Sequence, residues 1–312
     1  MRSHVIANPR AGRFASSPAA LDRLRSECGA HATVHVTGTL EELRRAVGRV
    51  REERAEVVAL CGGDGTHMAC VSALSQEYAG QPLPAIVLAT GGHANTVARN
   101  WCAKPEPPEV HVPRVLGALH GGARFTQRRR PTLRVTDSTG TTRVGFIFGA
   151  GLVAAFFEEF YARGGGGYVE AGRMVARILG GSFVGGRLAK RVLTPVPMRL
   201  TIDGNAHPSG AFTLVASSVL RNLGMHLMVT HRAGEDPRRP HLVASTLDVR
   251  ESGRQFWRIL AGRGLLDPRG HDGLASRFAL QGTGAYVLDG DLLRAQDVTV
   301  EAGPELELVE AT

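Results

Sequence analysis

The first 130 residues alternate short apolar runs with segments whose apolar side chains recur every three or four positions. The apolar runs at 5–7, 34–36, 57–60 and 85–89 predict strands. The periodic segments predict helices, one beginning at Ser17-Pro18 and another covering 40–50. Strands that are apolar throughout and alternate with helices are typical of a parallel sheet covered on both faces. In such sheets ligands bind beyond the carboxyl ends of the strands.

From Thr132 the pattern changes to a period of two, as at 133–135 and 198–202, with turns such as Asp203-Gly204. Further strands are predicted at 211–216, 242–249, 278–281, 285–288 and 298–301, which indicates a mostly antiparallel sheet. An apolar, glycine-punctuated and partly helical insertion covers 152–192. We therefore predict an α/β domain with a parallel sheet over 1–130. A mostly antiparallel β-sandwich domain follows over 131–312, with its last residues able to pack back on the first domain.

Composition narrows the class of protein. An apolar content of 43% fits a globular chain, and 312 residues favour two domains. The formal charge of +8 comes almost entirely from arginine, because Lys104 and Lys190 are the only lysines. This charge has two interpretations, a genomic preference for arginine or attraction to polyphosphate or an anionic membrane surface. Aromatic residues make up 5% and are not interleaved with a basic stripe, so we expect no nucleic-acid partner.

The cysteines and the N-terminus predict a location. Cys28, Cys61, Cys70 and Cys102 show no CxxC spacing, and Cys61 and Cys70 lie in apolar surroundings, so we expect reduced core residues. The first twelve residues lack the apolar segment of a signal peptide, and the longest apolar stretch, 144–157, is too short to span a bilayer. The expected location is cytoplasmic, peripheral to the inner face of the membrane.

The segment GGDGT, Gly62 to Thr66, is the main candidate for chemistry because it joins a buried strand to a helix. Neither lysine follows a glycine, so a P-loop is excluded, and no dinucleotide fingerprint, HExxH or nucleophile elbow occurs. A glycine turn at a helix N-terminus offers backbone N–H groups to an anion. Asp64 fits such a site if it holds Mg²⁺ on a phosphate, or takes a proton from a hydroxyl or a metal-bound water. An ordinary turn is the alternative.

Four stretches together resemble the diacylglycerol kinase catalytic-domain family, which also includes sphingosine and ceramide kinases and bacterial lipid kinases. They are GGDGT, NPRAG from Asn8 to Gly12, GHANT followed by Ala98-Arg99, and YVLDGD from Tyr286 to Asp291. The resemblance covers the whole chain and is most specific in the first domain. NAD kinases and ATP-type phosphofructokinases, which share GGDGT, are similar more distantly. The resemblance implies the fold common to NAD kinases and diacylglycerol kinases.

Carried over position by position, the resemblance implies an ATP- and Mg²⁺-dependent kinase acting on a lipid hydroxyl. Asp291 takes the place of the family's base, Asp289 is the alternative candidate for the base, and both are expected to face Asp64. Asp289 and Asp64 are the predicted metal ligands. An Asp-Gly hairpin turn is the competing interpretation for Asp289. The residues expected to bind nucleotide are Asn8, Gly12, Thr37, Gly62, Gly63, Asp64, Gly65, Thr66, Gly92, His93 and Asn95.

The sequence departs from the family pattern at several positions. Ala69 replaces a glutamate, His93 replaces a threonine, and the segment 217–227 lacks the usual asparagine-glycine pattern. His67 and His93 flank the predicted phosphate site. These changes keep two alternatives open, a catalytically inactive nucleotide- or lipid-binding sensor and a kinase for a soluble acceptor. NAD kinase is disfavoured, because no Asn in the chain precedes a Glu. A homodimer also stays open.

Overall fold

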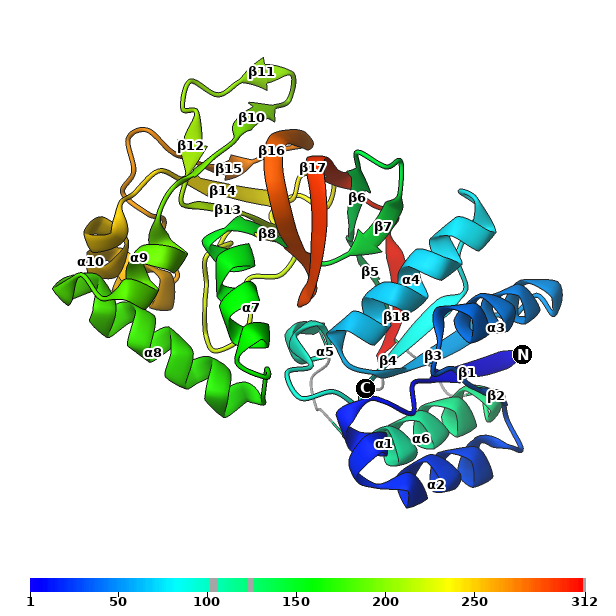
Figure 1. Cartoon of the computed structure of the whole chain (residues 1–312). Coiled ribbons are helices and arrows are strands. Elements are labelled where there is room, and N and C mark those ends of the chain that lie inside the picture. Colours follow the sequence, from blue (N-terminus) through cyan, green and yellow to red (C-terminus); the bar gives the residue numbers. More distant parts are fainter. Residues whose placement is uncertain (102–105, 123–125, 311–312) are drawn as a thin grey trace. The chain divides into compact units, whose positions relative to one another are not determined.

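The computed structural model describes residues 1–101, 106–122 and 126–310, so Cys102 and Lys104 lie outside the described residues. The chain divides into two compact units (Figure 1). The first contains residues 1–132 and the segment that begins at Pro304, and the second contains residues 133–303. Each unit has its own main sheet.

The first unit is built on a six-stranded sheet with the order β2-β1-β3-β4-β18-β5. All neighbours are parallel except β18 and β5, which are antiparallel. This sheet confirms the predicted parallel α/β class. Its strands are β1 (Ser3–Ala7), β2 (Thr33–Val36), β3 (Val57–Gly62), β4 (Ala85–Thr90), β5 (Thr126–Arg130) and β18 (Leu306–Glu310).

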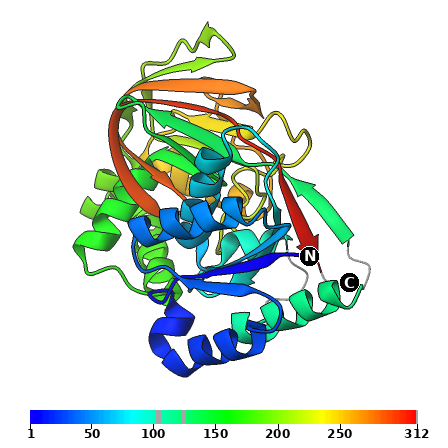
Figure 2. The ribbon, with the colours of Figure 1, turned by 90° about the vertical axis from the view of Figure 1, so that its right-hand side faces the viewer.

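Helices cover both faces of this sheet, as two views at right angles show (Figures 1 and 2). Helices α1, α2 and α6 lie on one face, and α3 and α4 lie on the other. Helix α5 follows β4. Their bounds are α1 (Gly12–Ser16), α2 (Pro18–Cys28), α3 (Leu40–Glu52), α4 (Asp64–Tyr78), α5 (Thr96–Trp101) and α6 (Pro108–His120).

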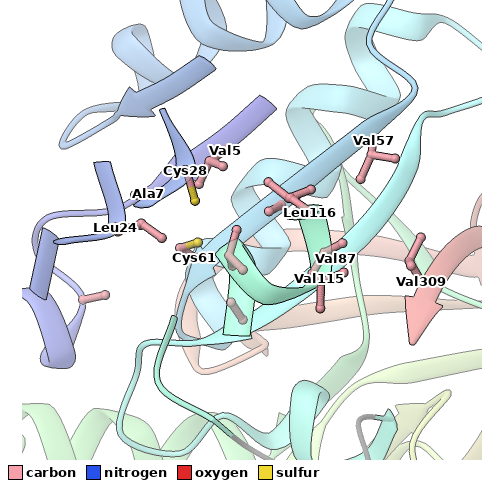
Figure 3. Close-up of a cluster of buried hydrophobic side chains, with 14 of the residues drawn as sticks. Val5, Ala7, Leu24, Cys28, Val57, Cys61, Val87, Val115, Leu116 and Val309 are labelled. Carbon is pink, nitrogen blue, oxygen red and sulfur yellow. The ribbon is translucent and has the colours of Figure 1, made fainter. Parts of the chain in front are cut away.

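Alternate strand residues fill the core under α2 and α6 (Figure 3). Val5, Cys61 and Val87 point from three neighbouring strands toward Leu24 and Leu116 of the helices. The residues between them, such as Leu60, are also buried because the other helix layer covers the second face. The strands therefore read as continuous apolar runs. Cys28, Cys61 and Cys70 are buried and free, and burial raises the pKa of the Cys28 thiol to about 11.

The second unit is built on a ten-stranded antiparallel sheet, which confirms the mostly antiparallel class predicted for this half. Its path runs β15-β14-β13-β8-β16-β17-β6-β7, with β10 and β11 branching from β16, and a small separate sheet pairs β9 with β12. The strands are β6 (Leu133–Asp137), β7 (Thr142–Gly145), β8 (Ile147–Gly151), β9 (Val196–Pro197), β10 (Arg199–Ile202), β11 (Asn205–Ala206), β12 (Ala211–Phe212), β13 (Leu214–Ser218), β14 (His241–Ser245), β15 (His271–Leu274), β16 (Arg277–Leu288) and β17 (Asp291–Ala302).

Four helices belong to the second unit, and the insertion predicted to be partly helical supplies three of them. Apolar side chains of α7, α8 and α9, including Phe156, Ile178 and Val192, form one core cluster. No helix among the described residues is both long enough and apolar enough to cross a bilayer. The helices are α7 (Leu152–Ala162), α8 (Tyr168–Val184), α9 (Arg187–Leu193) and α10 (Val249–Leu260).

Two strand predictions in the second unit differ from the structure. The segment predicted as a strand to 249 ends as β14 at Ser245, because Asp248 caps α10 by accepting hydrogen bonds from the N–H groups of Arg250 and Glu251. The strands predicted at 278–281 and 285–288 are one strand, β16. A bulge between Gln281 and Gly284 absorbs the glycines that looked like a turn.

Candidate active site

Two glycine turns pack directly against each other at the carboxyl ends of β3 and β4. Gly62-Gly63 follows β3 and Gly91-Gly92 follows β4, and the N–H of Gly91 donates a hydrogen bond of 2.7 Å to the Gly62 carbonyl. A Cβ atom on Gly92 would lie 2.5 Å from the Cα of Gly63, and one on Gly63 would lie 3.0 Å from the Cα of Gly92. Backbone packing therefore favours glycine at both Gly63 and Gly92, independent of any ligand.

Asp64 joins the GGDGT turn to the start of α5. One carboxylate oxygen accepts from the N–H of Thr96 at 2.8 Å and the other from the N–H of Val97 at 3.0 Å. Asp64 therefore satisfies two of the free donors at the N-terminus of α5. Each oxygen keeps a further lone pair, and the residue is half-buried, so Asp64 still fits a cation or a metal-bound water. Its catalytic role stays a prediction.

Asn95 closes the second glycine turn. Its backbone is left-handed, with φ of 50°, a conformation that asparagine tolerates better than most residues. The side-chain oxygen accepts from the N–H of Gly92 at 2.8 Å, and the side-chain NH₂ donates to the carbonyl of Gly92 at 2.7 Å. The buried amide of Asn95 therefore fixes the turn that carries His93.

The end of β1 is tied to both turns. Asn8 donates from its amide to the Thr66 hydroxyl at 2.9 Å, and the N–H of Arg13 donates to the Gly91 carbonyl at 2.9 Å. Gly12 lies under the His93 ring, where a Cβ would come within 2.6 Å of Cε1. Thr37, at the end of β2, is buried and donates its N–H to the Ala7 carbonyl.

A shallow pocket of about 460 Å³ opens beside these turns. Four predicted residues line it, namely Gly12, Gly92, His93 and Asn95, whereas the GGDGT residues are not among its lining residues in the described structure. The complete lining is Gly12, Arg13, Ser16, Thr90, Gly92, His93, Asn95, Arg99, Glu106 and Pro107.

Arg13 and Glu109 form the ion pair at this pocket that the sequence analysis missed. The hydrogen bond from the Arg13 guanidinium to Glu109 raises the pKa of Arg13. Burial raises the pKa of the Glu109 carboxyl, whose side chain is 2% exposed, but Arg13 and Arg23 outweigh this and the net pKa is lowered. Glu109 therefore holds the Arg13 cation at the pocket wall. The only sequence signal was an arginine directly after Gly12, which is too common to interpret alone.

The two histidines near the turns occupy different environments. His93 is exposed and lines the pocket. His67 is fully buried in α4, donates from Nε2 to the Ala89 carbonyl at 3.3 Å, and has its pKa lowered by burial. His67 is therefore a neutral core residue, and His93 is the histidine placed to contact a ligand.

In the second unit, Asp289 and Gly290 form the two-residue turn between β16 and β17. Leu288 pairs with Asp291, and the turn residues have φ of 50° and 94°. The Asp289 carboxylate is 7% exposed and accepts hydrogen bonds from the N–H groups of Phe146 at 3.0 Å and Ile147 at 2.9 Å. These bonds give Asp289 a structural role, and its role as a metal ligand stays a prediction.

Asp291 is the exposed acid of this hairpin. Desolvation raises the pKa of its carboxyl, and the charge of Arg143 opposes that shift. The hydroxyl of Tyr161 donates to the Gly290 carbonyl at 2.7 Å, which holds the turn against α7. Asp291 belongs to the second unit and Asp64 to the first, so the expectation that they face each other stays a prediction.

Comparison with known proteins identifies the class of the first unit. Residues 2–120 match the family model of the diacylglycerol kinase catalytic domain. The first unit is therefore similar to the catalytic domain of diacylglycerol kinases, in agreement with the three sequence stretches that lie within these residues.

The fold of the whole chain is similar to solved structures. A diacylglycerol kinase from Bacillus anthracis str. Sterne has 12% sequence identity and a TM-score of 0.63, and the match covers 99% of this chain and 96% of that one. A second structure from the same organism gives 13% identity and a TM-score of 0.67 at the same coverage. No curated protein matches the sequence. Identities this low establish the fold and leave the acceptor open.

The contact between the glycine turns predicts the effect of adding one methyl group. Gly92→Ala should lower the free energy of unfolding by about 1–3 kcal/mol, because the new Cβ overlaps the Gly63 backbone. Gly48→Ala is the control, since its Cβ would meet nothing within 4 Å on α3, and should raise the stability by about 0.5–1 kcal/mol. Urea denaturation measures both. Equal effects would contradict the packing role.

The two hairpin acids should differ in their contribution to stability. Asp289→Asn keeps one acceptor oxygen but turns an NH₂ group toward a backbone donor, so we expect a loss of about 1–3 kcal/mol in the free energy of unfolding. Asp291→Asn, at an exposed position, should stay within about 0.5 kcal/mol of wild type. Chemical denaturation of the two variants tests this, and a silent Asp289→Asn would free that carboxylate for another role.

Proposed function

We propose that the protein is an ATP- and Mg²⁺-dependent kinase that phosphorylates the hydroxyl group of a membrane lipid, such as diacylglycerol, ceramide or a sphingoid base. The observation that carries this proposal is the pocket lined by Arg13, Arg99 and His93 beside two closely packed glycine turns, in a unit that matches the diacylglycerol kinase catalytic domain. The lipid acceptor is inferred from the family and from an exposed surface of the second unit.

The first unit carries groups that are complementary to the triphosphate of ATP. Arg13 and Arg99 line the pocket, and His93 is exposed at its edge. The fifteen-residue helix α4 begins at Asp64 with no side-chain cap on its first N–H groups in the described structure. Free N–H groups and the helix dipole favour a negatively charged ligand there.

Each of these residues has a separate role in the proposed phosphoryl transfer. Asp64 would hold Mg²⁺ or one of its water ligands, and the ion would neutralise charge on the transferring phosphate. The arginines would orient the phosphates, and the glycine backbone allows close approach. Asp291 is the proposed base for the acceptor hydroxyl, because the other hairpin acid is held by backbone N–H groups.

The direct test is phosphate transfer from labelled ATP to vesicles that contain one candidate lipid each. Asp64→Asn should lower the rate at least 100-fold by removing a charge at the transferring phosphate. Arg99→Ala should weaken ATP binding, whereas Arg45→Ala, an exposed arginine on α3, should behave as wild type. Because Asp64 also caps α5, ATP-dependent thermal stabilisation is measured on each variant to separate misfolding from lost chemistry. A normal rate of phosphate transfer by Asp64→Asn would show that Asp64 only caps α5.

A catalytically inactive nucleotide- or lipid-binding sensor is the second candidate. Backbone N–H groups occupy the carboxylates of both Asp64 and Asp289, and Ala69 stands where the family has a glutamate. ATP that stabilises the protein without labelling a lipid or soluble alcohol would support the sensor. Labelling of a soluble alcohol and of no lipid would show that the acceptor is a soluble molecule.

An exposed apolar and basic surface of the second unit supports a membrane partner. Phe183 and Val184 at the end of α8 are 56% and 82% exposed, and Trp257 and Leu260 on α10 are 53% and 39% exposed. A Cβ on Gly253 of α10 would lie 3.7 Å from the Phe183 ring, so the two helices present these side chains together. The guanidinium groups of Arg258 and Arg263 lie over the Trp257 ring. Tryptophan flanked by arginine is typical of helices that lie in a membrane interface.

Binding to vesicles tests this surface separately from catalysis. We expect the protein to bind vesicles that contain anionic lipid and to be released by salt, because exposed charges are screened over about 8 Å at physiological ionic strength. Trp257→Ala should weaken binding several-fold. Leu40→Ala, which removes an equally exposed apolar side chain from the first unit, should not. If binding does not depend on salt, on lipid charge or on Trp257, the membrane proposal fails and the arginine excess is explained by a genomic preference.

A further inference from the structure

A cluster of two histidines and one aspartate lies at the edge of the sheet in the second unit, among residues that the kinase proposal does not use. His231, His241 and Asp272 each direct one potential ligand atom into the cluster, and these atoms all lie within 4.8 Å of one another. His241 is fully buried, His231 is half-buried, and the Asp272 side chain is 26% exposed. The cluster is therefore largely enclosed but has one side open to solvent.

Strand register brings two of these residues together. In the antiparallel pair β14 and β15, Val243 lies opposite Asp272 and His241 lies opposite Leu274. His241 and Asp272 are therefore diagonal neighbours on the same face of the sheet. Their side chains meet with Nε2 of His241 2.7 Å from a carboxylate oxygen of Asp272. His231 comes from the loop before β14, on a turn closed by a hydrogen bond from the Ala233 N–H to the Thr230 carbonyl.

Hydrogen bonds define which ring nitrogen of His241 carries the proton. The N–H of Arg232 donates to Nδ1 of His241 at 3.3 Å, so Nδ1 is an acceptor and the ring proton is on Nε2, directed at Asp272. Nδ1 of His231 is buried and has no hydrogen-bond partner among the described residues. The ring centroids of the two histidines are 5.0 Å apart. A buried polar atom without a partner is uncommon in a folded protein, so His231 has a ring nitrogen available to a ligand.

The charge and space around the cluster suit a cation. Asp272 brings a carboxylate to the cluster, with one oxygen 2.7 Å from Nε2 of His241. Arg232, the arginine beside it, is paired with Glu235 at 3.0 Å. Gly264 leaves the space open, because a Cβ there would lie 2.4 Å from an Asp272 oxygen and 3.4 Å from Cε1 of His231.

We propose that His231, His241 and Asp272 bind one divalent transition-metal ion of the zinc type. Two imidazole nitrogens and one carboxylate are a donor set that zinc uses, with a fourth position left for water. Metal–ligand bonds of about 2.0–2.2 Å place the donor atoms of a tetrahedral site about 3.3 Å apart, so small side-chain movements close the cluster on an ion. The ion takes the place of the Nε2 proton of His241 and fixes the 219–240 loop to the sheet edge.

The test titrates untagged, chelator-treated full-length protein with Zn²⁺ in competition with a metal indicator, and follows thermal unfolding in parallel. We expect one equivalent bound and a rise in melting temperature that a chelator reverses. Asp272→Asn and His231→Gln should each weaken Zn²⁺ binding by more than about 100-fold, since even outer-shell partners contribute 10- to 100-fold. His231→Gln alters a half-buried residue in a loop and is the variant more certain to fold.

A matched control is His226→Asn, in the same loop. His226 is exposed with φ of 58°, a conformation that asparagine also adopts, so this variant removes a histidine without straining the chain. It should bind Zn²⁺ as wild type does. Wild-type protein that binds no Zn²⁺, or two ligand variants that bind as tightly as wild type, would overturn the proposal and leave His241 and Asp272 as a hydrogen-bonded pair. Neither outcome depends on kinase activity.

Discussion

The close contact between two glycine turns is the constraint on which the first unit depends. Gly62-Gly63 and Gly91-Gly92 approach so closely that a single methyl group on Gly92 would overlap the Gly63 backbone. A Cβ on Gly92 would lie only 2.5 Å from the Cα of Gly63, so the turns that leave these neighbouring strands can pass each other only where side chains are absent. The contact brings the starts of α4 and α5 together, and the positions of Asp64, His93 and Asn95 follow from it.

The polar residues around this contact have structural functions as well as their expected chemical ones. Asp64 caps α5, Asn95 closes the turn before it, and Asn8 binds the Thr66 hydroxyl. A nucleotide would therefore meet groups that folding has already oriented, which lowers the entropic cost of binding.

The sequence predicted the strands of the first unit well, because a strand buried on both faces must be apolar at every position. The antiparallel half was harder to predict. The bulge in β16 contains glycines, which are typical of turns, although the strand continues through it. The cap at Asp248 ends β14 before the apolar pattern of the segment ends. The glycine motifs marked the site, but the pairing of Arg13 with Glu109 depends on helix packing across 96 residues of chain. No local pattern encodes such a pair, and the same holds for the His231, His241 and Asp272 cluster.

The position of β18 has a consequence for biosynthesis. This strand lies between β4 and β5 in the sheet of the first unit, yet it follows the entire second unit along the chain. While a ribosome is still translating the intervening 171 residues, 133–303, the edge of β4 has no partner and its backbone N–H and C=O groups are open to other chains. The sheet of the first unit can therefore be completed only after the second unit has emerged. Its folding is expected to wait for the synthesis of the second unit, and nascent chains that stall there are expected to need a chaperone.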